Sequence, residues 1–111
     1  MQPARKIASN YLLTCEGLTP APLVSIAPDG TLLAIRQVEH PDREPLTEFY
    51  AGVLVIGLDA ERFAQLATDH TTPLVELITP HLDPTRKNLL LISGLDYRRM
   101  VCTAQTRLQR L

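Results

Sequence analysis

Residues 49–62 read FYAGVLVIGLDAER, and this stretch decides what kind of fold the chain adopts. Its central part, GVLVIG, is apolar at successive positions, so both of its faces suit a buried environment. Periodicity alone does not separate a strand from a buried helix, but the short length and the valines favour a strand. Asp59 then offers a carboxylate that caps a helix, and Glu61 falls in the first turn, where a negative charge is favourable. The stretch predicts a buried strand that passes directly into a helix.

The residues before this stretch predict further strands. Residues 5–14, RKIASNYLLT, are rich in β-formers and show no helical periodicity. Residues 22–27 (PLVSIA) and 31–38 (TLLAIRQV) flank the sequence PDG, in which proline presets one dihedral and glycine accepts a positive φ. Residues 22–38 therefore predict a β-hairpin. The following EHPDREP, 39–45, combines two prolines with four charges and predicts an exposed loop.

The residues after Asp59 predict short helices and then another strand. A second helix is expected to start at Thr72 with Pro73 as its first residue, because proline is favoured in that position. Pro80 and Pro84 keep it short. NLLLIS at 88–93 is again apolar on both faces and predicts a buried strand.

The last segment, RRMVCTAQTRLQRL at 98–111, is ambiguous. One interpretation places Met100, Thr103, Ala104 and Leu108 on one face of a helix. The other is a strand, in which alternate residues such as Met100 and Cys102 share a face. Local propensity favours the helix.

Length and composition indicate one globular domain. The chain has 111 residues, of which 45% are hydrophobic and 21% charged, values typical of folded soluble proteins. Its longest apolar run, from Val53 to Leu58, is far shorter than the roughly 20 residues that cross a bilayer. The N-terminal residues contain no apolar core of a secretory signal. These features predict a cytoplasmic protein without a membrane partner.

The charge distribution gives little support to nucleic-acid binding. The formal net charge is −1, from eleven basic and twelve acidic residues, so there is no basic excess to attract phosphates. The basic residues near the C-terminus are expected at solvated outer positions of a strand pair. They are Arg98, Arg99, Arg107 and Arg110.

The sequence contains no motif typical of a catalytic nucleophile or of a redox-active cysteine pair. Cys15 and Cys102 lie in no CxxC pair, so we expect two reduced and buried thiols, with a disulfide between them as the alternative. Ser93 lacks the GxSxG context of a strand-to-helix nucleophile. The glycines form no phosphate-binding loop. The sequence thus assigns no catalytic or cofactor-binding residue.

The three histidines, His40, His70 and His81, give only a weak metal signal. A site shared by His70, His81 and Asp83 requires the intervening helix to bring them together, and such sites use three or four ligands at rigid spacings. The preferred interpretation is that the histidines are exposed in loops and at helix ends. No metal ligand is therefore assigned.

Both ends of the chain resemble one family. Residues 6–58 contain KIASNYLL, the hairpin PDGTLLAI and EFYAGVLVIGL, and resemble the N-terminal β segment of amidohydrolase-superfamily enzymes. The branch they resemble comprises deaminases and chlorohydrolases of heteroaromatic rings. Residues 87–111 resemble the C-terminus of the same enzymes. In that family the two ends form one small β-sandwich, the composite domain, and a catalytic (β/α)8 barrel is inserted between them.

The resemblance implies a mainly β (α+β) fold for this chain. The expected single domain is a small β-sandwich made by an N-terminal β segment (1–58) and a C-terminal strand pair (87–111). One or two short helices in 59–86 bridge them. The resemblance also implies a strand at about 99–104, against local propensity.

The family's catalytic parts are missing from this sequence. Aligning VIGLDAERFA with the family's PGFVNAHCH places Arg62 and Ala64 where two metal-binding histidines are expected. An arginine at ordinary pH has no lone pair to donate, and alanine has no ligand atom. The segment 59–86 is also far shorter than the roughly 200 residues of a (β/α)8 barrel.

The sequence therefore predicts a non-catalytic, amidohydrolase-related module with a structural or interaction role. In the family one side of the composite domain packs on the barrel, so the corresponding apolar surface needs another cover here. A homodimer, or a barrel-bearing amidohydrolase as partner, meets that need. The alternative is a degenerate or oligomer-assembled metal-dependent hydrolase or deaminase that acts on C–N bonds of a heteroaromatic substrate.

Overall fold

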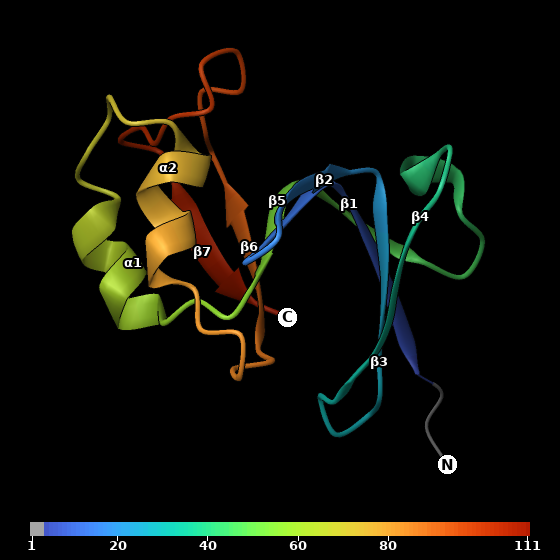
Figure 1. Cartoon of the computed structure of the whole chain (residues 1–111). Coiled ribbons are helices and arrows are strands. Elements are labelled where there is room, and N and C mark those ends of the chain that lie inside the picture. The colour runs from blue at the N-terminus through green and yellow to red at the C-terminus, as the bar shows by residue number, and fades with distance from the viewer. Residues whose placement is uncertain (1–3) are drawn as a thin grey trace.

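Seven strands form one sheet in the computed structural model, which describes residues 4–111. The strands are β1 (Arg5–Thr14), β2 (Gly17–Pro20), β3 (Pro22–Ile26), β4 (Leu32–Gln37), β5 (Glu48–Ile56), β6 (Leu89–Ser93) and β7 (Arg107–Arg110). Their order is β4–β3–β1–β5–β6–β7, and β2 pairs with the second half of β1 (Figure 1). β1 and β5 run parallel, whereas all other neighbours run antiparallel. The predicted mainly β domain is confirmed.

The predicted hairpin is formed by β3 and β4. Gly30 has a φ of +90° and donates its N–H to the carbonyl oxygen of Ala27 at 2.9 Å. The carboxylate of Asp29 accepts the N–H of Thr31 at 2.9 Å, which closes the turn. The predicted turn at PDG is therefore confirmed, and it depends on the glycine because glycine tolerates a positive φ.

The sheet bends sharply along one row of residues, Asn10, Ala21, Ala51 and Gly52, which we call the bend. The register of β1 with β5 passes from Ser9 opposite Tyr50 to Tyr11 opposite Val53, so β5 carries a bulge of one extra residue opposite Asn10. On the other side of β1, Ala21 has a φ of +51° and separates β2 from β3. Figure 1 shows two arms meeting at the bend.

The first arm contains β3, β4 and the first halves of β1 and β5; the second contains β2, β6, β7 and the second halves of β1 and β5. Apolar side chains from both arms pack together on the inner face of the bend. This inner core consists of Ile7, Leu12, Val24, Ile26, Leu54, Ile56, Leu89 and Leu91. A single bent sheet thus stands where two sheets of a sandwich were expected, because β1 and β5 run through both arms.

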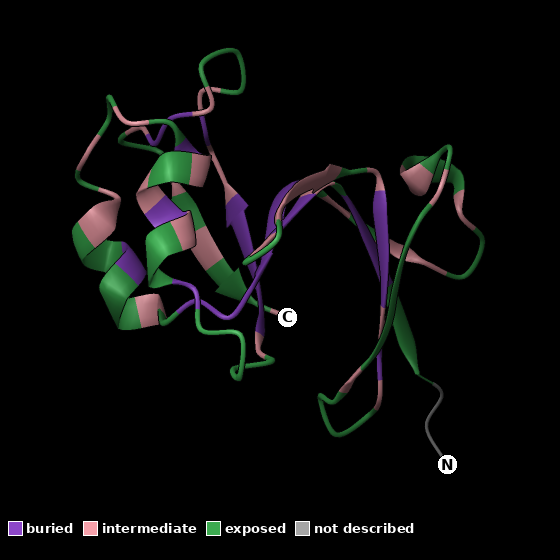
Figure 2. Cartoon of the chain, in the orientation of Figure 1, coloured by how far each residue is buried: buried purple, intermediate pink, exposed green. Residues whose placement is uncertain are grey.

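A second, outer core lies between the second arm and the helices. Val53 and Val55 of β5 point into it, whereas Leu54 and Ile56 point into the inner core. Figure 2 shows β5 and β6 buried along this half. The prediction that GVLVIG is a strand covered on both faces is therefore confirmed. Beyond the strands, buried members of the outer core include Leu58, Phe63, Leu74, Ile78 and Cys102.

The helices are short and belong to the outer core. They are α1 (Ala60–Leu66) and α2 (Leu74–Ile78), with 3-10 turns η1 (Pro41–Arg43) and η2 (Thr79–His81). The carboxylate of Asp59 accepts the N–H of Glu61 at 3.2 Å, which confirms the predicted cap of α1. α2 begins one residue later than expected, with Pro73 preceding its first residue. Within residues 4–111, no helix has the length and hydropathy to cross a bilayer.

The prediction of a strand at 99–104 is wrong. Residues 97–100 form a turn, and only Val101 makes an isolated bridge, with Asp96. The hydroxyl groups of Thr103 and Thr106 both donate to the carbonyl oxygen of Gly94, at 2.7 and 3.2 Å. These side-chain contacts hold the segment as a loop, and the last strand, β7, starts only at Arg107.

Candidate functional site

The histidines considered as metal ligands do not come together. His40, His70 and His81 are all exposed, in a loop, after α1 and at the end of η2. The carboxylate of Asp83 accepts the N–H and the hydroxyl of Thr85, at 2.9 and 2.7 Å. Over the described range 4–111, no three histidine, cysteine or acidic side chains gather in a way that could hold a metal ion.

Arg62 and Ala64, at the positions aligned with the family's metal-binding histidines, lie on α1. Both are exposed, while Phe63 between them is buried against the sheet. α1 follows β5 through Gly57, which has a φ of +95° and donates its N–H to the carbonyl oxygen of Asn88 at 3.4 Å. The helix that follows β5 therefore packs on the sheet through Phe63, and Arg62 and Ala64 on either side of it point to solvent.

The two cysteines have different surroundings. Cys102 is buried in the outer core, and burial raises the pKa of its thiol. Cys15 is exposed in the turn between β1 and β2, so the expectation that both thiols are buried is wrong for this residue. Both are free thiols, as the sequence predicted.

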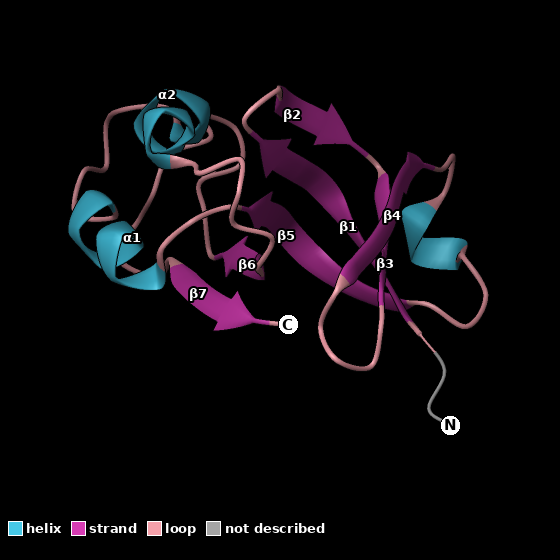
Figure 3. Cartoon of the chain, turned by 60° about the horizontal axis from the view of Figure 1, so that its bottom comes forward, coloured by secondary structure: helices cyan, strands magenta, loops and turns pink. Residues whose placement is uncertain are grey.

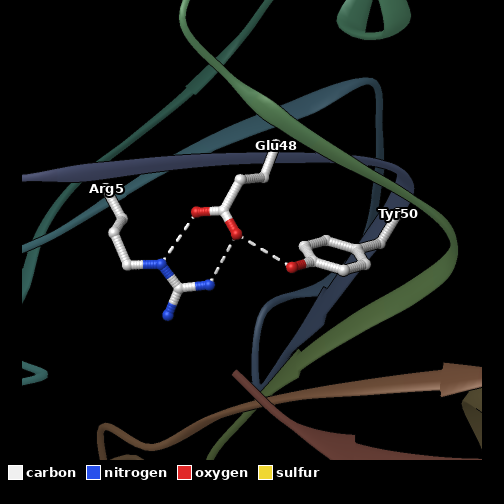
Figure 4. A network of polar contacts seen from close by, with 3 residues as sticks. All are labelled: Arg5, Glu48 and Tyr50. Atoms are coloured by element: carbon white, nitrogen blue, oxygen red, sulfur yellow. Dashed lines mark hydrogen bonds and ion pairs between the residues drawn. The ribbon is translucent and has the colours of Figure 1, made fainter.

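A polar network joins β1 to β5 in the first arm (Figure 4). Arg5 donates to both carboxylate oxygens of Glu48, from Nε and Nη2, each at 2.8 Å. Tyr50 donates its hydroxyl to the same carboxylate at 2.9 Å. The hydrogen bond from Arg5 lowers the pKa of Glu48, and the hydrogen bond to Glu48 raises the pKa of Tyr50. The network ties together the first halves of the two strands that cross the bend.

Asp69 organises the connection between α1 and α2. Its carboxylate accepts the hydroxyl of Thr72 at 2.6 Å, the hydroxyl of Thr71 at 2.9 Å and both backbone N–H groups. These hydrogen bonds, the Thr72 hydroxyl first among them, hold the pKa of Asp69 well below its usual range. Every donor comes from the next three residues, so the arrangement stabilises a turn.

A groove of about 540 Å³ lies over the outer side of the bend. Its lining residues come from β1, the β2–β3 junction, η1, the bulge of β5 and the loop before Val101. They are Asn10, Tyr11, Pro20, Ala21, Pro41, Ala51 and Tyr97. Tyr97 is 45% exposed and is one of the few large apolar side chains that reach solvent. None of these lining residues carries a charge.

Sequence reasoning missed this groove. Its residues are distributed between positions 10 and 97, and they become neighbours only because three strands change direction along one row. No local pattern marks Asn10 or Ala21 as a place where the sheet turns. The side chains that line the groove include no carboxylate, imidazole or thiol.

No protein-family model, no curated protein and no solved structure matches this chain. The resemblance to the amidohydrolase superfamily therefore stays a prediction from the residues quoted above.

Proposed function

We propose that this protein is a non-catalytic interaction module that pairs with a second copy of itself through the groove at the bend. The observation that supports this proposal is the lining of the groove: two tyrosines, two prolines and two alanines around Asn10. Aromatic side chains are enriched in protein interfaces, and charged ones are depleted at interface centres.

The lining of the groove combines a large aromatic side chain with small side chains. Tyr97 is a large side chain that reaches solvent, whereas Ala21 and Ala51 are small residues that line the same groove, on the bend. In a two-fold symmetric pair each copy presents the same patch, so Tyr97 of one copy meets the alanines of the other and the reverse. The pairing buries the exposed ring and removes no charge from water, which avoids a desolvation cost.

Two related ideas stand beside this one as proposals. A barrel-bearing amidohydrolase is a second candidate partner, because of the sequence resemblance. A cytoplasmic location is proposed from the composition. Leu33 and Ile35 are also exposed, on the outermost strand, β4. We do not propose that a partner, whether a second copy or an amidohydrolase, pairs with the backbone edge of this strand. β4 is irregular at Leu33, where the register with β3 shifts, and irregular edge strands pair poorly with other chains.

Light scattering across a range of protein concentrations tests the proposal. We expect a dimer for the unchanged protein and a shift to monomer for Tyr97→Ser and for Ala51→Lys. Leu46→Asn is the matched control, because Leu46 is 96% exposed and lies outside the groove. A monomer at high concentration, or equal loss of the dimer in the control, contradicts the proposal.

Metal analysis separates the module from the alternative of an oligomer-assembled hydrolase. We expect no stoichiometric zinc or iron in the purified protein. Stoichiometric metal that is lost together in His70→Ala and His81→Ala supports the enzyme instead, and overturns the non-catalytic assignment.

A further inference from the structure

β7 is the last strand in the order of the sheet, and within residues 4–111 no other strand pairs with its outer backbone edge. The N–H of Leu111 donates to the carbonyl oxygen of Leu89 at 3.3 Å, so Leu111 faces β6. Backbone groups alternate along an antiparallel strand, hence Arg107 and Gln109 also face β6, while Leu108 and Arg110 face away. Figure 3 shows β7 at the rim of the sheet, consistent with its place at the end of the strand order.

This edge is regular, unlike the other short edges of the sheet. Its four residues pair with β6 in an unbroken register from Ser93 opposite Arg107 to Leu90 opposite Arg110. β4 has a register shift, and β2 begins with glycine and ends with proline, which cannot donate to a ladder. β7 contains neither proline nor glycine.

The side chains of the edge are basic on both of its faces. Arg107 and Arg110 are exposed, and in the described range 4–111 neither lies within ion-pair distance of a carboxylate. Asp59 and Arg110 line the same hollow, but the Asp59 carboxylate caps α1. Because the two arginines are three residues apart, they project from opposite faces of the strand.

We infer that the free edge of β7 binds an acidic extended segment of a partner protein by strand addition. Leu108 and Arg110 supply the backbone donors and acceptors, as in other complexes in which a peptide extends a sheet. Two carboxylates three residues apart in the partner lie opposite Arg107 and Arg110. A second copy of this chain does not fit, because it brings four arginines to one short edge with no acidic residue in β7 to offset them.

This inference does not rest on the proposed groove association, since β7 and the groove share no residue. Groove variants thus test only the dimer, and β7 variants test only the binding of an acidic peptide. Either proposal can therefore fail while the other holds.

Fluorescence anisotropy tests the inference with a short labelled peptide of alternating valine and threonine that carries two glutamates three positions apart. We expect binding by the whole protein at low ionic strength that weakens as salt is added. Replacement of both arginines, Arg107→Glu with Arg110→Glu, is expected to weaken binding about tenfold or more. Circular dichroism is used to check that this variant is folded.

Two controls make the test specific. Arg98→Glu with Arg99→Glu changes the same charge in an exposed turn that is not part of β7, and it should leave most of the binding intact. A peptide methylated on alternate backbone nitrogens keeps its charge but loses donors, and it should bind several-fold more weakly. Equal loss in the control variant, no effect of methylation, or no binding at low salt would overturn the inference.

Discussion

Asn10 and Gly52 are joined across the bend: Oδ1 of Asn10 accepts the backbone N–H of Gly52 at 2.9 Å. The bulge in β5 takes Gly52 out of the regular ladder with β1, so this donor needs another partner. The neighbouring Ser9 is fully buried and donates its hydroxyl towards the carbonyl oxygens of Tyr50 and Gly52, at 2.6 and 2.9 Å. Two consecutive side chains of β1 therefore satisfy the backbone of β5 where the sheet bends.

Asn10→Ala should destabilise the fold by about 1 kcal/mol, the usual net worth of one such hydrogen bond. Water reaches the exposed Asn10 and limits the loss. Asn10→Asp keeps the acceptor oxygen and should retain most of the stability. Urea unfolding at a single protein concentration measures both variants, and a larger loss in the aspartate variant would contradict the role given to Oδ1.

Gly52→Ala should destabilise the protein by more than about 3 kcal/mol or prevent folding. Gly52 has a φ of +140°, and an added Cβ overlaps the carbonyl oxygen of Ile92 on β6. Gly17→Ala is the matched control, because Gly17 has a φ of +122° but open space around it. It should lose only about 1–2 kcal/mol through backbone strain. Thermal unfolding compares the two, and equal losses would show that the approach to Ile92 is unimportant.

Glu48 should make stability depend on pH in the acidic range. Its pKa is lowered by the hydrogen bond from Arg5, so its contribution is fully present above its unfolded pKa of about 4.3. That contribution is lost as the pH falls through the lower folded pKa. Both side chains are 42% exposed, which keeps the effect below about 1 kcal/mol.

The comparison of the unchanged protein with Glu48→Gln isolates this group. We expect the stability difference between the two proteins in urea unfolding to shrink between pH 7 and about pH 3, because Glu48 becomes protonated in the unchanged protein. The other carboxylates titrate in both proteins, so their effect cancels in the comparison. A difference that stays constant over this range contradicts the coupling of Glu48 to Arg5.

The two thiols should react at very different rates. Cys15 is exposed, whereas Cys102 is buried and its pKa is raised by that burial, which keeps the reactive thiolate scarce. A chromogenic thiol reagent should modify one cysteine quickly and the second only after denaturant is added. Cys15→Ser should remove the fast phase and leave the slow one, and a fast phase that persists in this variant contradicts the assignment.

The strands and turns that depend on neighbouring residues were predictable. PDG forms the hairpin turn, GVLVIG forms a strand buried on both faces, and Asp59 caps α1. The segment 98–111 was not predictable, because its conformation depends on Gly94. The hydroxyl groups of Thr103 and Thr106 reach the carbonyl oxygen of that glycine only once the turn at 97–100 has formed.

The sequence by itself determined that this is a mainly β chain with two short helices, since alternation, turn residues and caps act over a few positions. Only the tertiary structure decided that one bent sheet replaces a two-sheet sandwich, and that a groove forms over the bend. Asn10, Ala21 and Gly52 are far apart in sequence, and each is an ordinary residue in its own segment. Their effect comes from lying side by side in three paired strands, where a bulge, a positive φ and a hydrogen bond turn the sheet together.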